Sequence, residues 1–253
     1  LEAQGMVRPR NRRQLEVGYD FLLRTRNELH LQTKRLADDI PKALQPKIAW
    51  QLGYKDRSPA RRLEAFMRDL YTHMRAIHLI TRMVERRLAL RPKPARRLPS
   101  LRSFFGGGKK TKTLDGFNII DGELVPISPR IFRDQPRRLM RVFLHAQQRG
   151  LEFHPDLTQL LRDNVSLVDD DFVHDTENRE TFLEILNQRG NVAPALRAMH
   201  EVDLLGRYIP EFGRMTCLVQ HEFFHAYAAD EHTLVCLEKL DQVWGAAKPP
   251  FAH

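Results

Sequence analysis

Two histidines separated by one helical turn are the first candidates for chemistry in this sequence. His221, Glu222 and His225 lie in the segment QHEFFHAYAADEHTL, which spans residues 220–234. Together they match the HExxH pattern of zinc peptidases, in which the two imidazoles bind Zn²⁺ and the glutamate activates water. A zinc peptidase is therefore one hypothesis for this chain.

That hypothesis needs a third metal ligand, which the segment does not supply in the usual form. The longer HExxHxxGxxH pattern would place glycine at Ala228 and histidine at Glu231. Glu231 or the adjacent His232 could still bind zinc in another geometry. We favour the simpler interpretation, in which His221 and His225 cap, stack or pack along a helix.

A second candidate is the pair His174 and Asp175, because adjacent histidine and aspartate side chains can hold one metal of a phosphohydrolase site. The pair lies in DDDFVHDTENRE, where Asp175 is well placed to cap the start of a helix. Helix capping is the expected role. Asp169, Asp170 and Asp171 could gather a cation, but consecutive carboxylates do not all face one point, so we expect a solvated turn.

The stretch GGGKKT at residues 106–111 superficially resembles a phosphate-binding loop. It lacks the GxxxxGK[ST] spacing and follows no expected strand, so we do not assign it that role. It belongs to residues 91–113, RPKPARRLPSLRSFFGGGKKTKT, which combine proline, glycine and unbalanced positive charge. That composition predicts a flexible basic linker.

The cysteine content and the hydropathy pattern limit where the protein acts. Cys217 and Cys236 are too few for a disulfide framework and have no CxxC spacing, so we expect both to be ordinary buried residues. A reducing compartment, the cytoplasm, is favoured. No run reaches the roughly 18 apolar residues of a membrane span, and the start LEAQGMVRPRNRR has no hydrophobic signal core. We expect that start to be an internal boundary of a longer protein.

The net charge of +9 is unevenly divided along the chain. Residues 1–113 hold 27 Lys and Arg against 10 Asp and Glu, and the remainder holds 14 against 22. A basic half of this kind can attract nucleic acid, anionic lipid or an acidic protein face. A non-catalytic basic helical interaction module is therefore a further hypothesis. Nucleic acid is not the expected partner, because neither an RNA-recognition signature nor a zinc finger is evident.

Two stripes of residues with alternating spacings of four and three predict long helices that pack antiparallel. A short helix is expected between them at residues 47–52, after the breaks at Pro41 and Pro46. The second long helix should extend over about 30 residues. The first stripe comprises Leu15, Tyr19, Leu22, Arg26, Leu29, Thr33, Leu36 and Ile40, and the second comprises Leu63, Met67, Leu70, Met74, Ile77, Thr81, Val84 and Leu88.

Beyond the linker, the pattern predicts one small β-hairpin followed by a compact second bundle. The segment FNIIDGELV alternates apolar residues around Asp121 and Gly122, a pair that suits a tight hairpin turn. The fold class is therefore all-α with this one hairpin. Helical patterns follow at residues 135–148, 155–164, 177–188, 192–202 and 231–244.

The residues at the ends of these patterns support them. Arg149-Gly150 and Arg189-Gly190 each combine a basic last turn with a glycine stop. Pro155 is suited to begin the helix expected at residues 155–164, and Asp175 is suited to begin the helix expected at residues 177–188.

Three long strings resemble the family of bifunctional uridylyltransferase/uridylyl-removing enzymes that modify the PII nitrogen-regulatory protein. They are FLLRTRNELHLQTKRL, FLEILNQRGNVAPALRAMHEVDLLGRYIPEF and GRYIPEFGRMTCLVQHEFFHAYAADEHTL. The resemblance covers nearly the whole chain in order. Because the strings are long and unusual, it is much more specific than the HExxH match.

The resemblance implies a helical region between the family's nucleotidyltransferase domain and its HD phosphohydrolase domain. It implies that His232 is the first metal-binding histidine of the HD domain, for Mg²⁺ or another divalent ion. The parent enzyme would be cytoplasmic and would transfer UMP from UTP to a tyrosine of PII and remove it again. Family members often have aspartate where Glu222 stands, so the resemblance implies that the HExxH match is accidental. His221 and His225 would then be structural neighbours of His232 and not metal ligands.

The departures from the family pattern are also informative. The HD site needs a later His-Asp pair and a further aspartate, whereas this chain stops at His253. The glycine-serine turn and Asp-x-Asp pair of the transferase are missing too. We therefore expect no complete active site, no activity and no tightly bound metal in the isolated chain. The expected regions are long helices (1–90), linker (91–113), connecting helical domain (114–218) and incomplete HD domain (219–253).

Overall fold

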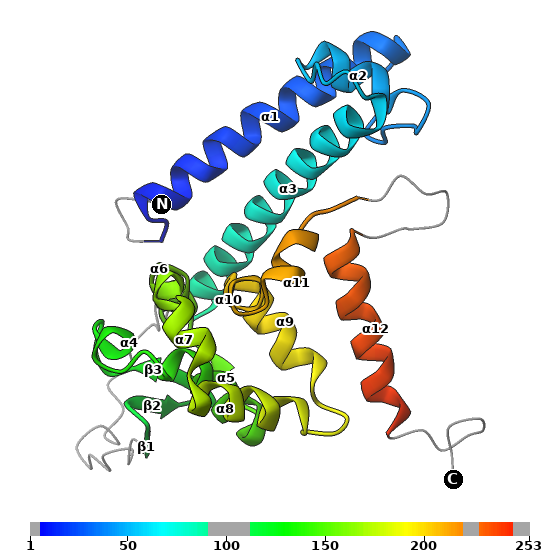
Figure 1. Ribbon diagram of the computed structural model, residues 1–253. Coiled ribbons are helices and arrows are strands. Elements are labelled where there is room, and N and C mark those ends of the chain that lie inside the picture. The colour runs from blue at the N-terminus through cyan, green and yellow to red at the C-terminus, as the bar shows by residue number, and fades with distance from the viewer. Residues whose placement is uncertain (1–5, 91–111, 220–227, 245–253) are drawn as a thin grey trace, which may run out of the picture. The chain divides into compact units, whose positions relative to one another are not determined.

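The computed structural model describes residues 6–90, 112–219 and 228–244, and these are mostly helical with one small sheet (Figure 1). The expected all-α class with a minor β element is confirmed. The peptidase candidates His221, Glu222 and His225 lie outside the described residues, as do residues 106–111 and nearly all of the expected linker.

The chain forms two compact units. The first comprises residues 1–86 and 211–233, and the second comprises residues 87–210 and 234–253. The domain boundaries expected from the sequence remain predictions. In the described part of the chain, no helix is both long and apolar enough to cross a membrane.

The first unit contains the two predicted long helices. They are α1 (Pro9–Thr33) and α3 (Pro59–Ala89), with the short helix α2 (Gln45–Gln51) between them. The 31 residues of α3 match the predicted length. Helix α1 ends before the predicted stripe does, because Lys34 adopts a left-handed conformation with φ of 53°.

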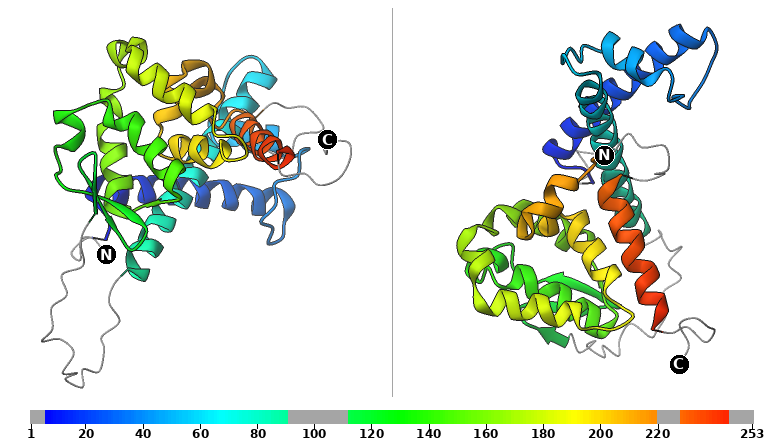
Figure 2. Two further views of the ribbon diagram at one scale, coloured as in Figure 1. Left: turned by 90° about the horizontal axis from the view of Figure 1, so that it is seen from below. Right: turned by 45° about the vertical axis from the view of Figure 1, so that its right-hand side comes forward.

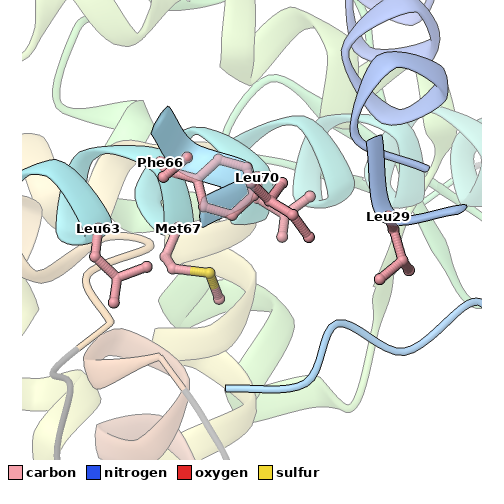
Figure 3. Close-up of a cluster of buried hydrophobic side chains, with 7 residues drawn as sticks. Leu29, Leu63, Phe66, Met67 and Leu70 are labelled. Atoms are coloured by element: carbon pink, nitrogen blue, oxygen red, sulfur yellow. The ribbon is translucent and has the colours of Figure 1, made fainter. Parts of the chain in front are cut away.

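Helices α1 and α3 pack antiparallel, as predicted (Figure 1). Near the start of α1, a Cβ atom placed on Gly18 would lie 3.1 Å from Cδ1 of Ile77. Further along, the ring of Phe21 lies 4.6 Å from that of His73. The far end of α1 contributes Leu29 to a buried cluster with the start of α3 (Figure 3), whose members are Leu29, Ile48, Ala49, Leu63, Phe66, Met67 and Leu70.

The buried face of α1 differs from the predicted stripe. Tyr19 is 64% exposed and Leu36 is 86% exposed, so both were placed wrongly in the core. The buried residues of α1 are Asn11, Gly18, Thr25 and Leu29. Three of these four are polar or lack a side chain, and hydrophobic periodicity therefore could not reveal the face on which they lie.

The stripe of α3 is correct in its first half only. Met74 and Leu88 are each about half exposed, whereas Ile80 and Met83 are buried in their place. A strict repeat of seven residues drifts by about 20° per heptad on a straight helix, so over 31 residues the buried face moves away from the stripe.

The second unit contains the predicted hairpin within a larger sheet. Strands β2 (Phe117–Ile120) and β3 (Glu123–Pro126) pair antiparallel around Asp121 and Gly122, both of which have positive φ. Two short strands were not predicted: β1 (Lys112–Leu114) pairs antiparallel with β2, and β4 (Glu152–Phe153) pairs parallel with β3. The sheet lies at one end of this unit (Figure 2).

Helix α5 (Arg138–Arg149) is the centre of the second unit and packs against both α8 and α9. Its apolar face contributes to a core with Phe117 of the sheet and Phe132, all of them almost fully buried. The other elements are α4 (Ile131–Asp134), α6 (Pro155–Asn164), the 3₁₀ helix η2 (Val165–Leu167), α7 (Asp170–His174), α8 (Thr176–Leu186), α9 (Ala193–Glu201), α10 (Leu204–Tyr208), and α11 (Pro210–Met215) at the boundary between the units.

Most of the predicted helix ends are confirmed, but the stop predicted at Arg189-Gly190 is wrong, because α8 already ends at Leu186. Gly150 ends α5 in a left-handed conformation, and Pro155 begins α6. Asp175 caps α8, as expected. Asp169 and the two aspartates after it do not form a turn, however: Asp169 caps the short helix α7 and the other two lie in its first turn.

Helix α12 (Ala229–Val243) begins in the first unit and lies in the second unit from Leu234 onward. There Asp241 Oδ2 accepts a 2.7 Å hydrogen bond from the backbone N–H of Ala193, at the start of α9. Glu238 of α12 also pairs with Arg197 of α9, at 2.7 Å. The later part of α12 is therefore held along α9. On the exposed side of α12 lies Cys236, so the prediction that both cysteines are buried holds only for Cys217.

Candidate functional site

A tight turn between β1 and β2 places a carboxylate over α5. Asp115 and Gly116 have φ of 47° and 85°, the left-handed conformations that a two-residue hairpin turn requires. Glycine is needed at the second position, because a Cβ there would also lie 3.0 Å from Cδ1 of Ile131. The turn directs Asp115 toward one face of α5.

Three side chains on that face of α5 converge on Asp115. Arg138, Arg141 and His145 are spaced by three and four residues and therefore share one side of the helix. Arg141 makes two hydrogen bonds of 2.9 Å to the carboxylate, Arg138 makes one of 3.2 Å, and Nε2 of His145 lies 3.3 Å away. All four side chains are largely buried, so the cluster fastens the sheet to α5 in a partly dehydrated environment.

The surroundings lower two pKa values in this cluster. Burial raises the pKa of Asp115, but hydrogen bonds from Arg141 and Arg138 more than offset it, so the net pKa lies below the ordinary value. For His145, burial lowers the pKa, and the hydrogen bond to Asp115 only partly opposes that effect. Near neutral pH His145 is therefore uncharged and donates from Nε2 to Asp115, and its buried Nδ1 has no hydrogen-bond partner within the described residues.

These shifts predict that the second unit loses stability in mild acid. A histidine whose folded pKa is lowered is protonated more readily in the unfolded chain, so stability is retained above its ordinary pKa of about 6.5 and falls as the pH drops below it. The contribution of Asp115 is lost only at a lower pH, below its ordinary value of 3.8. Urea unfolding at about pH 7.5 and about pH 5.5 should show the loss, and His145→Gln should reduce it. An undiminished loss in His145→Gln, or an equal reduction in a His78→Gln control at an exposed site on α3, would show that other groups are responsible.

An open pocket of about 480 Å³ adjoins the cluster through Arg141. It lies among α4, the start of α5, α7 and the start of α8. Its lining is formed by Asp134, Gln135, Pro136, Arg137, Arg141, Leu167, Asp169, Asp171, Phe172, Asp175 and Asn178. The structure thus brings together three of the aspartates that the sequence singled out in DDDFVHDTENRE.

His174 and Asp175 do not form a metal site in this arrangement. The carboxylate of Asp175 accepts hydrogen bonds from the backbone N–H of Asn178 at 2.9 Å and from Arg137 at 2.6 Å. The hydrogen bond from Arg137 contributes most to the lowered pKa of Asp175. His174 instead directs Nδ1 to the backbone oxygen of Asp170, 2.7 Å away, and is not part of the pocket lining. The capping role predicted for Asp175 is confirmed.

His232 lies in the first turns of α12, with its backbone N–H bonded to Ala228 O at 2.8 Å and its side chain exposed. Residues 6–90, 112–219 and 228–244 contain no group of three histidine, cysteine or acidic side chains that could hold a metal ion. His232 is thus one accessible imidazole, and the described residues do not fit a divalent ion by themselves.

Two family models match the chain one after the other. The model described as GlnD PII-uridylyltransferase matches residues 1–85, and the model described as uridylyltransferase GlnD third domain matches residues 117–208. The bifunctional uridylyltransferase/uridylyl-removing enzyme of Cereibacter sphaeroides is 32% identical over 96% of the chain. The chain belongs to the GlnD uridylyltransferase family.

Two further relatives of the chain carry the same name. The enzyme of Ruegeria pomeroyi is 32% identical over 94% of the chain, and that of Azospirillum brasilense is 31% identical over 96%. The chain spans about a quarter of the length of these curated relatives: 26% for Cereibacter sphaeroides and Ruegeria pomeroyi, and 25% for Azospirillum brasilense. No solved structure matches it.

The Asp115 cluster was not predicted from the sequence, although two signals for it were present. Asp115-Gly116 is a second Asp-Gly pair, six residues before the pair that was interpreted correctly as a hairpin turn. Arg138, Arg141 and His145 have the spacing of one helical face. The two signals come from separate segments, and only the folded chain shows that they meet.

Proposed function

We propose that this chain is the connecting helical part of a bifunctional uridylyltransferase/uridylyl-removing enzyme. The observation that carries the proposal is the extent of the match, which covers nearly all of this chain but about a quarter of each relative. The parent enzyme transfers UMP from UTP to a tyrosine of PII and later hydrolyses the phosphodiester bond between UMP and that tyrosine. The two helical units would orient its catalytic domains, which the remainder of the enzyme would supply.

His232 is proposed as the first metal-binding residue of the uridylyl-removing site. Its side chain is exposed on α12, so its imidazole is accessible to an ion. The family pattern adds a later His-Asp pair and a further aspartate, and Mg²⁺ or another divalent ion would polarise the phosphodiester when bound. The part of this chain described by the structure contributes that one imidazole.

The full enzyme that contains this segment provides the test. Changing His232 to alanine should reduce uridylyl removal by about 100-fold, because one metal ligand is lost, while UMP transfer to PII continues. The matched control is His78→Ala, at an exposed position of α3, which should affect neither reaction. Unchanged uridylyl removal in His232→Ala would refute the metal role, and the absence of UMP transfer and removal in the unmodified full enzyme would refute the proposed function itself.

The other two hypotheses have less support. The zinc-peptidase pattern falls on residues outside those the structure describes, and the family match accounts for the same segment without it. The basic interaction module rests on the net charge of the first half alone, which ion pairs such as Arg12 with Glu16 and Arg24 with Asp20 do not remove. The connecting role in the uridylyltransferase therefore remains the proposed function.

A further inference from the structure

The pocket among α4, α5, α7 and α8 has the size of a small-molecule site and an excess of negative charge. Its volume of about 480 Å³ lies in the usual range for sites that hold small ligands. Four aspartates and two arginines line it, together with apolar groups of Pro136, Leu167 and Phe172. What the pocket can bind depends on which of these charged groups still have free hydrogen-bonding capacity.

Most of the donors that could bind an anion are already engaged. Arg137 pairs with Asp175 and with Glu177, both at 2.6 Å. Arg141 is bonded to Asp115 and, at 3.2 Å, to Oε1 of Gln135. The first backbone N–H groups of α5 are also used, because those of residues 138 and 139 donate to the carbonyls of residues 135 and 136 at 3.1 and 2.9 Å. A phosphate or carboxylate would have to displace these partners or share the pocket with four aspartate carboxylates.

The acceptors of the pocket, in contrast, have capacity to spare. Asn178 is only 1% exposed, and its Nδ2 donates to the backbone oxygen of Phe172 at 3.0 Å. That bond fixes the orientation of the amide and leaves Oδ1 buried, with no hydrogen-bond partner in the described part of the chain. Buried amide oxygens normally accept a hydrogen bond, so Oδ1 is an acceptor that a bound molecule can use.

Asp171 provides a free charge in the lining of the same pocket. Its side chain is exposed in the first turn of α7, and it makes no hydrogen bond or ion pair with any residue that the structure describes. A bare metal ion does not fit the pocket, since no three acidic, histidine or cysteine side chains converge among residues 112–219. The open groups call instead for a ligand that is positively charged and carries several N–H donors.

We propose that this pocket binds a small organic cation, an alkylguanidinium or alkylammonium, whose N–H groups donate to the carboxylate of Asp171 and to Oδ1 of Asn178. The alkyl part of such a cation would lie against the apolar walls at Pro136 and Leu167. The site goes beyond the connecting role proposed above, because it gives this segment a ligand of its own. It lies entirely within residues 117–208, the part that matches the GlnD third domain.

Titration calorimetry of the purified chain with agmatine, which has a guanidinium at one end and an ammonium at the other, tests the site directly. We expect saturable binding of one agmatine per chain. Asp171→Asn should weaken it about tenfold, the loss expected for one charge-assisted contact. The matched control is Asp170→Asn, which removes the same charge from an adjacent exposed position that does not line the pocket. The affinity of this variant for agmatine should equal that of the unmodified chain.

Several outcomes would overturn the proposal. They are no agmatine binding at millimolar concentration, equal weakening by both substitutions, and saturable binding of inorganic phosphate that agmatine does not displace. Thermal melting of both variants verifies that they remain folded. If Asp171→Asn does not fold, the site is tested by NMR in the unmodified chain. Slower hydrogen exchange of the Asn178 side-chain amide on addition of agmatine would support the proposal, and unchanged exchange would contradict it.

A second titration distinguishes two sources of the same ligand chemistry. The probe is the peptide Gly-Arg-Gly with an acetylated amino end and an amidated carboxyl end, which presents a guanidinium as a protein would. Tighter binding of agmatine would support the proposal with a free small cation as ligand. Tighter binding of the peptide, with the same dependence on Asp171, would support it with a basic side chain of a partner protein as ligand.

Discussion

Replacing Phe66 with alanine is expected to lower the free energy of unfolding of the first unit by about 3–5 kcal/mol. The ring of Phe66 is fully buried in the cluster shown in Figure 3. It lies 6.4 Å from the ring of Phe21 in α1 and 5.6 Å from that of Tyr54, in the loop before α3. Truncation would open a cavity where α1, this loop and α3 meet.

The two tryptophans of the chain allow this loss to be measured in one unit at a time. Trp50 belongs to the first unit and Trp244 to the second. In a Trp244→Phe background, urea unfolding followed by fluorescence reports on the first unit alone. The control is Met74→Ala, a truncation on the same helix at a residue that is 49% exposed, which should change stability by about 0.5 kcal/mol or less. Similar losses for the two substitutions would show that this cluster is not the principal core of the unit.

The first unit also shows why a sequence can reveal a helix without revealing its buried face. Periodicity predicted α1 and α3, their antiparallel packing and their approximate lengths. It failed for the face of α1 because Gly18 lies against Ile77, where an added Cβ would be 3.1 Å away. Close approach of two helices favours a small residue at the contact, and such a residue contributes nothing to a hydrophobic pattern.

The second unit was predicted well where local signals decide the structure. The hairpin at Asp121-Gly122, the glycine stop at Gly150 and the cap at Asp175 each depend on the conformational preference of one or two residues. Strand β4 was missed because its two residues are defined by pairing with β3, far away in the sequence. Local propensity carries no information about such a partner.

The candidate ligand pocket could not be predicted for the same reason. Its wall combines α4, the start of α5, η2, α7 and the start of α8. The sequence did indicate that the aspartates near residue 170 are chemically unusual, and it correctly assigned Asp175 to a helix cap. The orphaned oxygen of Asn178, by contrast, is a property of packing, because it depends on which donors the folded chain places nearby.

Replacing Asp115 with asparagine is expected to destabilise the second unit by about 2–3 kcal/mol. The substitution keeps the turn intact, since asparagine tolerates the left-handed conformation that Asp115 adopts. It removes the negative charge that Arg138, Arg141 and His145 share. Breaking a fully buried ion pair costs about 3–5 kcal/mol, and the smaller value is expected here because the side-chain exposure of 18% at Asp115 leaves some access to water.

The second Asp-Gly turn of the same sheet supplies the control for this prediction. Asp121→Asn makes the same chemical change at the same kind of turn, but the side chain of Asp121 is exposed and the effect should be within about 0.5 kcal/mol. In a Trp50→Phe background, the fluorescence of Trp244, whose ring lies 4.9 Å from Arg189, follows the second unit. Equal stability of the two variants would mean that the sheet is held to α5 by apolar packing alone. A larger loss for Asp115→Asn would show that charge pairing, which a hydrophobic pattern does not reveal, sets the position of the sheet on α5.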